Sequence, residues 1–172
     1  MLNSGVNLTY TDITSNMMVG IETAITSHIP FFIAVYHGHR PISSDDIKFP
    51  CVMIEPVRAD ENLITVGKTE HKAEFTVYFY IVNNSRYGLI KMQSEAMNAL
   101  LKLFSNNALG DLQTATPTYK YKRWYTTGEQ YWIDSEIKSP EYSPTFSFLL
   151  SDKEQFCRAG KLNLELTDRF VR

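Results

Sequence analysis

Hydrophobic and polar positions alternate along one long stretch of the chain, from Lys68 to Val82. Successive side chains of a strand point to opposite sides, so this alternation predicts a β-strand with one apolar face. That face carries Phe75, Val77, Phe79 and Ile81. A strand of this length would span about 45 Å, whereas a compact chain of this size has a radius of gyration near 16 Å. We therefore expect its polar first half, Lys68–Glu74, to project from the core.

Apolar residues recur at steps of three and four in two other stretches, which predicts two amphipathic helices. The first begins at Asp12 or Thr14, either of which can cap a helix, and ends at about His28. The second runs from Leu89 to Phe104, with Ser85 as its expected cap. Each helix presents one apolar stripe, and we expect both stripes to pack on a sheet.

Shorter apolar and aromatic runs predict the remaining strands, at 31–36, 51–55, 62–66, 145–150 and 161–167. Pro50 and Pro56 should mark the ends of the second of these strands. The leucines of the last run alternate and should face the core. The sequence thus predicts a single α+β domain over 1–172, mainly an antiparallel β-sheet with one long hairpin strand and two helices packed on the sheet. A β-rich aromatic extension is expected at about 111–150.

Composition and charge narrow the possible functions. The 172 residues are 44% hydrophobic and 13% aromatic, enough for a proper core, and 17 basic against 19 acidic residues argue against binding to duplex nucleic acid. No apolar run approaches the ~20 residues needed to cross a bilayer, so we expect no membrane partner. Cys51 and Cys157 have no metal or redox spacing and are expected to be reduced core thiols.

Candidate chemical motifs are incomplete. Gly67-Lys68-Thr69 copies the end of a phosphate-binding loop, but the segment after it is predicted to be a strand where that motif requires a helix. His37 and His39 have no cysteine near them, so a solvated loop is favoured over a zinc site. His71 is expected on the surface of the long strand, and the acidic pairs at 45–46 and 60–61 in solvated loops. The sequence predicts no enzyme, no metal and no cofactor.

A basic and aromatic run from Tyr119 to Tyr125 is the sharpest local anomaly. Interleaved rings and cations can stack bases and follow a phosphate backbone, as in single-strand binding proteins. Tyrosine, tryptophan and arginine are also enriched in protein interfaces. Because the chain is slightly acidic overall, we favour a protein interface or ordinary packing over nucleic acid.

The order of the predicted elements resembles that of the tail terminator proteins of tailed bacteriophages. The resemblance is carried by the helix Ile13–His28, the segment Phe49–Ile54, the strand Phe75–Val82 and the helix Leu89–Phe104. These segments cover roughly half of the chain. Related neck and tail-completion proteins resemble it nearly as well.

This resemblance implies a structural virion protein that forms a ring, usually a hexamer, on the head-proximal end of the tail tube. Such a ring stops tube growth and joins the tail to the head-side connector, so tube and neck proteins would be its partners. DNA would pass through the lumen without specific binding. The protein would be found in the tail or neck of the virion, and in the host cytoplasm during assembly.

Assembly contacts are expected in three segments: the loop 37–46, the polar start of the long strand and the aromatic run. The residues are His37, His39, Arg40, Lys68, Thr69, Glu70, His71, Lys72, Tyr119, Tyr121, Arg123 and Trp124. The alternative is a single-stranded nucleic-acid binding module that uses the aromatic run. A small enzyme, the third possibility, would need a concave site with perturbed titratable groups.

Overall fold

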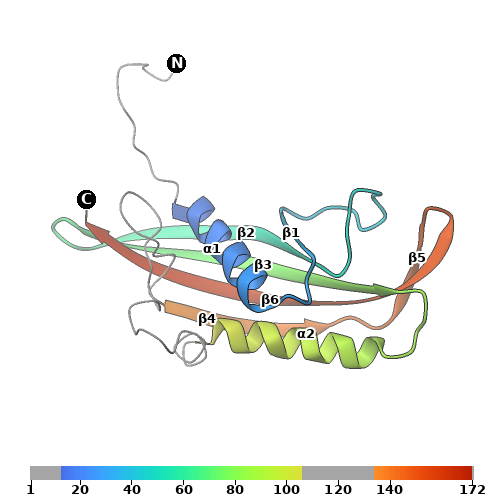
Figure 1. Ribbon diagram of the computed structural model, residues 1–172. Helices are drawn as coiled ribbons and strands as arrows, with labels where there is room; N and C mark the ends of the chain where they lie inside the picture. Colours follow the sequence, from blue (N-terminus) through green and yellow to red (C-terminus); the bar gives the residue numbers. More distant parts are fainter. Residues whose placement is uncertain (1–12, 106–133, 172) are drawn as a thin grey trace, which may run out of the picture.

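The computed structural model describes residues 13–105 and 134–171. Within these ranges, two helices lie on one face of a six-stranded sheet, which confirms the predicted α+β class (Figure 1). The elements are α1 (Ile13–His28), β1 (Ala34–His37), β2 (Cys51–Thr65), β3 (Lys68–Asn83), α2 (Leu89–Phe104), β4 (Asp134–Tyr142), β5 (Phe146–Leu150) and β6 (Lys153–Val171). Neither helix is long and apolar enough to span a membrane.

The strand order is β1-β2-β3-β6-β4, and β5 pairs with the start of β6. Only β1 and β2 are parallel; the other described pairs are antiparallel. The long strand β3 lies at the centre, and Phe75 has Pro56 of β2 on one side and Leu164 of β6 on the other. Both neighbouring strands pair with β3 as far as its first residue, since Lys68 lies opposite Thr65 of β2 and Val171 of β6.

The main core lies between the sheet and the two helices. The four apolar residues predicted for the inward face of β3 are fully buried there, and so are the alternating leucines of β6, Leu162, Leu164 and Leu166, as predicted. The ring of Phe79 packs directly over Gly160 of β6, and a methyl group at Gly160 would overlap that ring. The core therefore requires glycine at this position.

A second, smaller core lies on the opposite face of the sheet. It is formed by Ile47, Cys51, Met53, Tyr80 and Cys157, with partly buried side chains of the 38–50 loop and β5 packed against them. Both cysteines are buried and free, as predicted. Burial raises the pKa of each thiol to about 12.

We expect neither native thiol to react with a thiol reagent at pH 8, since the thiolate is the reactive form and both groups stay protonated in the fold. Both should react at once in denaturant. The measurement is the time course of modification with and without urea, with Val66→Cys, an exposed position, as the positive control. Rapid modification of the native wild-type protein would contradict this packing.

The prediction that Pro56 ends a short strand is wrong. β2 continues through Pro56 to Thr65, and Asp60 and Glu61 lie in this strand instead of a loop. Since β1 pairs only with Cys51–Ile54, the outer side of β2 beyond Ile54 has no described neighbour. Proline lacks an N–H donor and is tolerated on such an edge, here beside a register shift between Pro56 and Arg58.

The polar first half of β3 is more buried than predicted. Thr69, His71 and Ala73 alternate with more exposed residues and are buried, His71 being only 5% exposed. The surface position predicted for His71 is therefore wrong. The cause is tertiary: His71 is covered because β2 and β6 flank it and a side chain of α1 contacts it.

Smaller differences occur at the ends of elements. Ser85 does not cap α2; its hydroxyl accepts a hydrogen bond from the Tyr87 amide in the preceding turn. Gly88 occupies the cap position with φ of 81°, a left-handed conformation that favours glycine. The strand predicted at 31–36 is the shorter Ala34–His37. Pro140 lies within β4 at a register shift.

Candidate functional site

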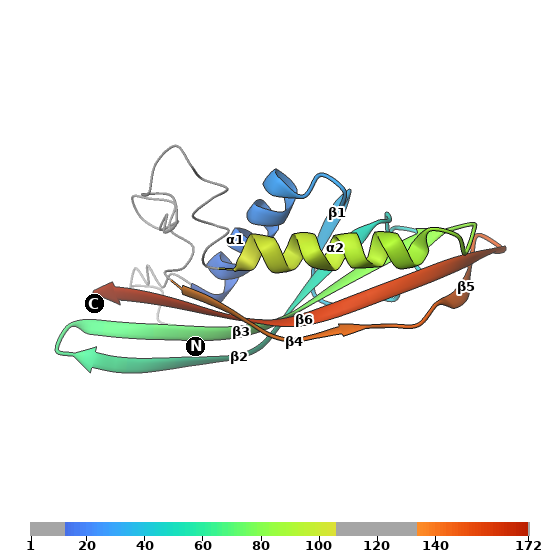
Figure 2. The ribbon, with the colours of Figure 1, turned by 90° about the horizontal axis from the view of Figure 1, so that it is seen from below.

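The outer parts of β2, β3 and β6 form a three-stranded arm, 55–65, 68–76 and 163–171, with the β2–β3 turn at its end. The base of the arm takes part in the main core, and its far end continues past both helices (Figures 1 and 2). The backbone of β3 is paired on both sides along the arm, whereas β2 has a described partner on one side only. Among the described residues, β4 pairs with the outer side of β6 as far as Thr167, so the longer open edge of the arm is that of β2.

Large apolar side chains are exposed at the end of the arm. Val66 is 100% exposed and Leu63 73%, and Ile64 and Val57 are also exposed on or next to β2. We call Leu63, Ile64 and Val66 the arm tip. An edge strand with unpaired backbone groups and apolar side chains is a template for pairing with another chain. This combination makes the arm the best candidate for a binding surface.

The residues that the sequence predicted on β3 are divided between two environments. Thr69 and His71 are buried, while Lys68 is exposed and Glu70 forms an ion pair with Lys72 at 3.7 Å. Because β2 and β6 occupy both edges, a second chain cannot pair with the β3 backbone. The assembly contacts predicted for Lys68–Glu74 therefore cannot be backbone pairing and stay a prediction for the side chains of this segment; the available strand edge is on β2.

His71 belongs to a polar row that the sequence did not predict. Its Nε2 lies 3.1 Å from the hydroxyl of Thr14 on α1, and its Nδ1 lies 3.4 Å from Glu61 on β2. Asp168 of β6 is its neighbour in register and is fully buried. A hydroxyl, an imidazole and a carboxylate are the groups of a hydrolase triad. Neither cavity described below includes Thr14 or His71, so we interpret the row as the polar attachment of α1 to the arm.

The loop after β1 is fastened to the sheet. A 2.7 Å hydrogen bond joins His39 to the hydroxyl of Tyr80, and burial raises the pKa of Tyr80 to about 12. Arg40 lies over the Tyr36 ring and 3.4 Å from Asp46. These contacts orient the loop. Its predicted role in assembly stays a prediction.

His37 lies on β1 and not in the loop. It pairs with Glu22 of α1 at 2.7 Å. Within residues 13–105 and 134–171, no group of three His, Cys, Asp or Glu side chains has the geometry to hold a metal.

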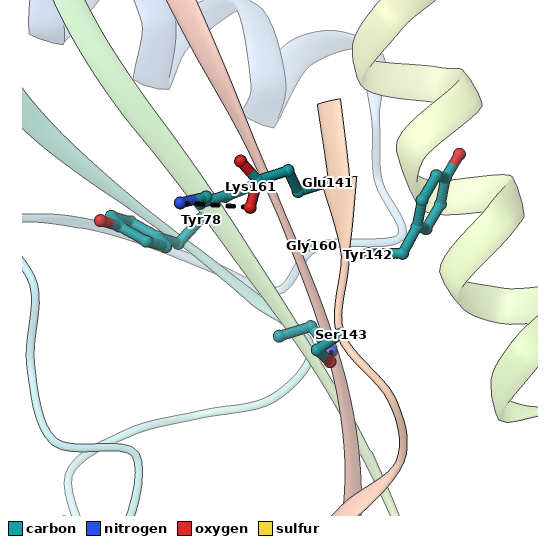
Figure 3. A pocket seen from close by; sticks show the side chains of 7 residues that line it. Tyr78, Glu141, Tyr142, Ser143, Gly160 and Lys161 are labelled. Atoms are coloured by element: carbon teal, nitrogen blue, oxygen red, sulfur yellow. Dashed lines mark hydrogen bonds and ion pairs between the residues drawn. The ribbon is translucent and has the colours of Figure 1, made fainter. Parts of the chain in front are cut away.

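A small pocket of about 170 Å³ lies where β4 and β6 meet β3 (Figure 3). Its polar lining residues include Tyr78, Glu141, Ser143 and Lys161, and Lys161 pairs with Glu141 at 3.3 Å. The ring of Tyr142 points away from this pair toward α2 (Figure 3). Because its lysine and glutamate neutralise each other, the pocket is a weak candidate for a charged ligand.

A more apolar groove of about 230 Å³ lies between α2 and the segment that follows α1. We call it the helix groove; its lining is Ile29, Phe31, Met92, Glu95, Ala96 and Ala99. Glu95 is its only charged member, and Phe31 is exposed. No local sequence pattern predicts the helix groove, because it forms between two segments about sixty residues apart.

The predicted aromatic contacts Tyr119, Tyr121, Arg123 and Trp124 lie outside the described residues. Comparison with models of known protein families found no match, and a search of curated proteins found no similar sequence.

Proposed function

We propose that this protein is a structural subunit that forms a ring at the head-proximal end of a phage tail tube, ends tube growth and joins the tail to the head connector. The observation that carries the proposal is the arm, with its open β2 edge and its apolar tip. The order of helices and strands, which resembles that of tail terminators, supports the same function.

Physical reasoning connects the arm to a ring. An exposed apolar edge on a small domain favours association, and natural proteins usually blunt such edges with lysine, proline or a covering segment. Pro56 blunts the base of the β2 edge and Arg58, Asp60 and Glu61 put charge on its middle, so its apolar part is the end, at Leu63 and Ile64. In the proposed ring, the surface that the arm meets on the next copy lies elsewhere on the molecule. Such heterologous contacts close into rings when the rotation permits.

The test is the solution mass of the purified protein by light scattering across concentration, followed by negative-stain imaging. We expect a ring of about six copies of the 19.8 kDa chain, alone or on added tail tubes. Val57→Lys, which places a charge on the open edge, should raise the concentration needed for association about tenfold. Leu149→Lys, an equally exposed position on β5, is the matched control.

Both variants should keep the wild-type melting temperature, because both side chains are exposed. A protein that forms no ring and does not bind the ends of tail tubes would contradict the proposal. Salt-sensitive quenching of tryptophan fluorescence by single-stranded oligonucleotides would then favour the nucleic-acid binding alternative.

A further inference from the structure

The arm tip leaves three aliphatic side chains in water. Val66 has no part of its side chain covered, Leu63 is 73% exposed, and Ile64 is exposed beside them. Burial of one such side chain stabilises an association by about 1.5–3 kcal/mol. The tip is therefore suited to insert into an apolar recess.

The helix groove is such a recess on the same chain. Its lining is apolar except for Glu95 and comes from α2 and the segment after α1. α2 lies away from the end of the arm (Figure 2). The tip is fixed at the far end of β2 and β3, strands that continue into the sheet core beneath the helices. It cannot fold back onto its own groove, so a tip that occupies the groove must come from another copy.

The charges beside the two surfaces are complementary. Lys68 follows the turn at the tip, and none of the described ion pairs of the arm includes it. Glu95 lies in the groove with its side chain 64% exposed, in a loose 3.8 Å pair with Lys91. A tip that enters the groove can bring Lys68 to Glu95.

We propose that the arm tip of one copy inserts into the helix groove of the next copy, with Leu63, Ile64 and Val66 against Phe31 and Met92. This inference rests on the proposed ring function and names the contact that builds the ring. The contact is heterologous: each copy offers its tip to one neighbour and its groove to the other.

Site-directed cross-linking tests this contact. Val66→Cys protein and Glu95→Cys protein are mixed in equal amounts and treated with a short bismaleimide, and the products are separated on a denaturing gel. The buried native thiols should not contribute. We expect cross-linked dimers at least ten times more abundant than in a mixture of Val66→Cys with Leu149→Cys, an exposed position on β5. The doubly substituted Val66→Cys/Glu95→Cys protein should give a ladder that stops at the ring size.

Each outcome of cross-linking and imaging is decisive. Rings without cross-links above the control would overturn the tip contact and leave the ring function standing. A ladder without an upper limit would support the contact and overturn the closed ring. Absence of both cross-links and rings, in the protein alone and with added tail tubes, would overturn both proposals.

A charge exchange tests the role of Lys68. The test uses a mixture of Val66→Cys protein with Ala99→Cys protein. Adding Glu95→Lys to the Ala99→Cys chain should reduce the cross-link yield by about two- to fivefold, the range expected of an exposed ion pair. Adding Lys68→Glu to the Val66→Cys chain should restore the yield. An unchanged yield with Glu95→Lys, or no recovery with the exchanged pair, would overturn the Lys68–Glu95 pairing.

Discussion

Replacement of Gly160 with valine is expected to lower the free energy of unfolding by about 3 kcal/mol, the upper end of the range for overpacked cores. Phe79 lies directly against the glycine, and the Met97 side chain lies 3.1 Å from where a Cβ would be. Both neighbours are fully buried between the sheet and α2, so neither can move into solvent. Urea unfolding followed by circular dichroism measures the loss.

A double-mutant cycle with Phe79→Leu identifies the cause. Leucine removes the ring that meets the new side chain, so Gly160→Val should cost less in the Phe79→Leu background than in the wild type. Equal costs in the two backgrounds would mean that contact with the Phe79 ring is not the source of the instability.

Replacement of Gln93 with leucine is expected to cost about 3 kcal/mol, although leucine is the better residue for a buried helix position. Gln93 is 2% exposed, and its amide donates to the carbonyls of Ser143 and Ala159 at 2.9 and 2.5 Å. Its carbonyl accepts a 2.8 Å hydrogen bond from Arg158. Leucine would leave a partly buried guanidinium and the Ser143 carbonyl without these partners, and each such loss costs about 1–3 kcal/mol.

Asn98→Leu is the matched control, because Asn98 lies on the exposed side of the same helix. It should change the free energy of unfolding by less than about 0.5 kcal/mol. If Gln93→Leu proves as stable as Asn98→Leu in urea, these hydrogen bonds do not hold α2 to the sheet.

Local periodicity was sufficient to predict the elements whose pattern is strong. The alternation from Phe75 to Ile81, the helical stripe from Leu89 to Phe104 and the leucines of β6 each have one buried face in the structure. The prediction at Pro56 was wrong because proline ends a strand only where a neighbouring strand would accept a hydrogen bond from an N–H at that position. That neighbour, β1, pairs with only four residues of β2, Cys51–Ile54, a fact of sheet order that no local pattern contains.

The candidate surface was harder to predict for the same reason. The sequence identified the polar part of β3, but β2 and β6 cover both of its edges, and the side chain of Thr14 on α1 meets His71. The open edge lies on β2 because β2 continues to Thr65, beyond the residues that pair with β1. The helix groove joins residues of α2 to Ile29 and Phe31, and the packing of segments so distant in sequence could not be read from either one.

The pairing of β3 with β6 has a consequence for how the chain folds. Lys68 pairs with Val171 and Asn83 with Phe156, so the middle of the sheet is closed by β6, the last of the described strands along the chain. Until β6 pairs with it, β3 has an open edge along its whole length. Folding that waits for such distant contacts is slow, and an unpaired strand edge exposes the hairpin of β2 and β3 to premature aggregation in the meantime.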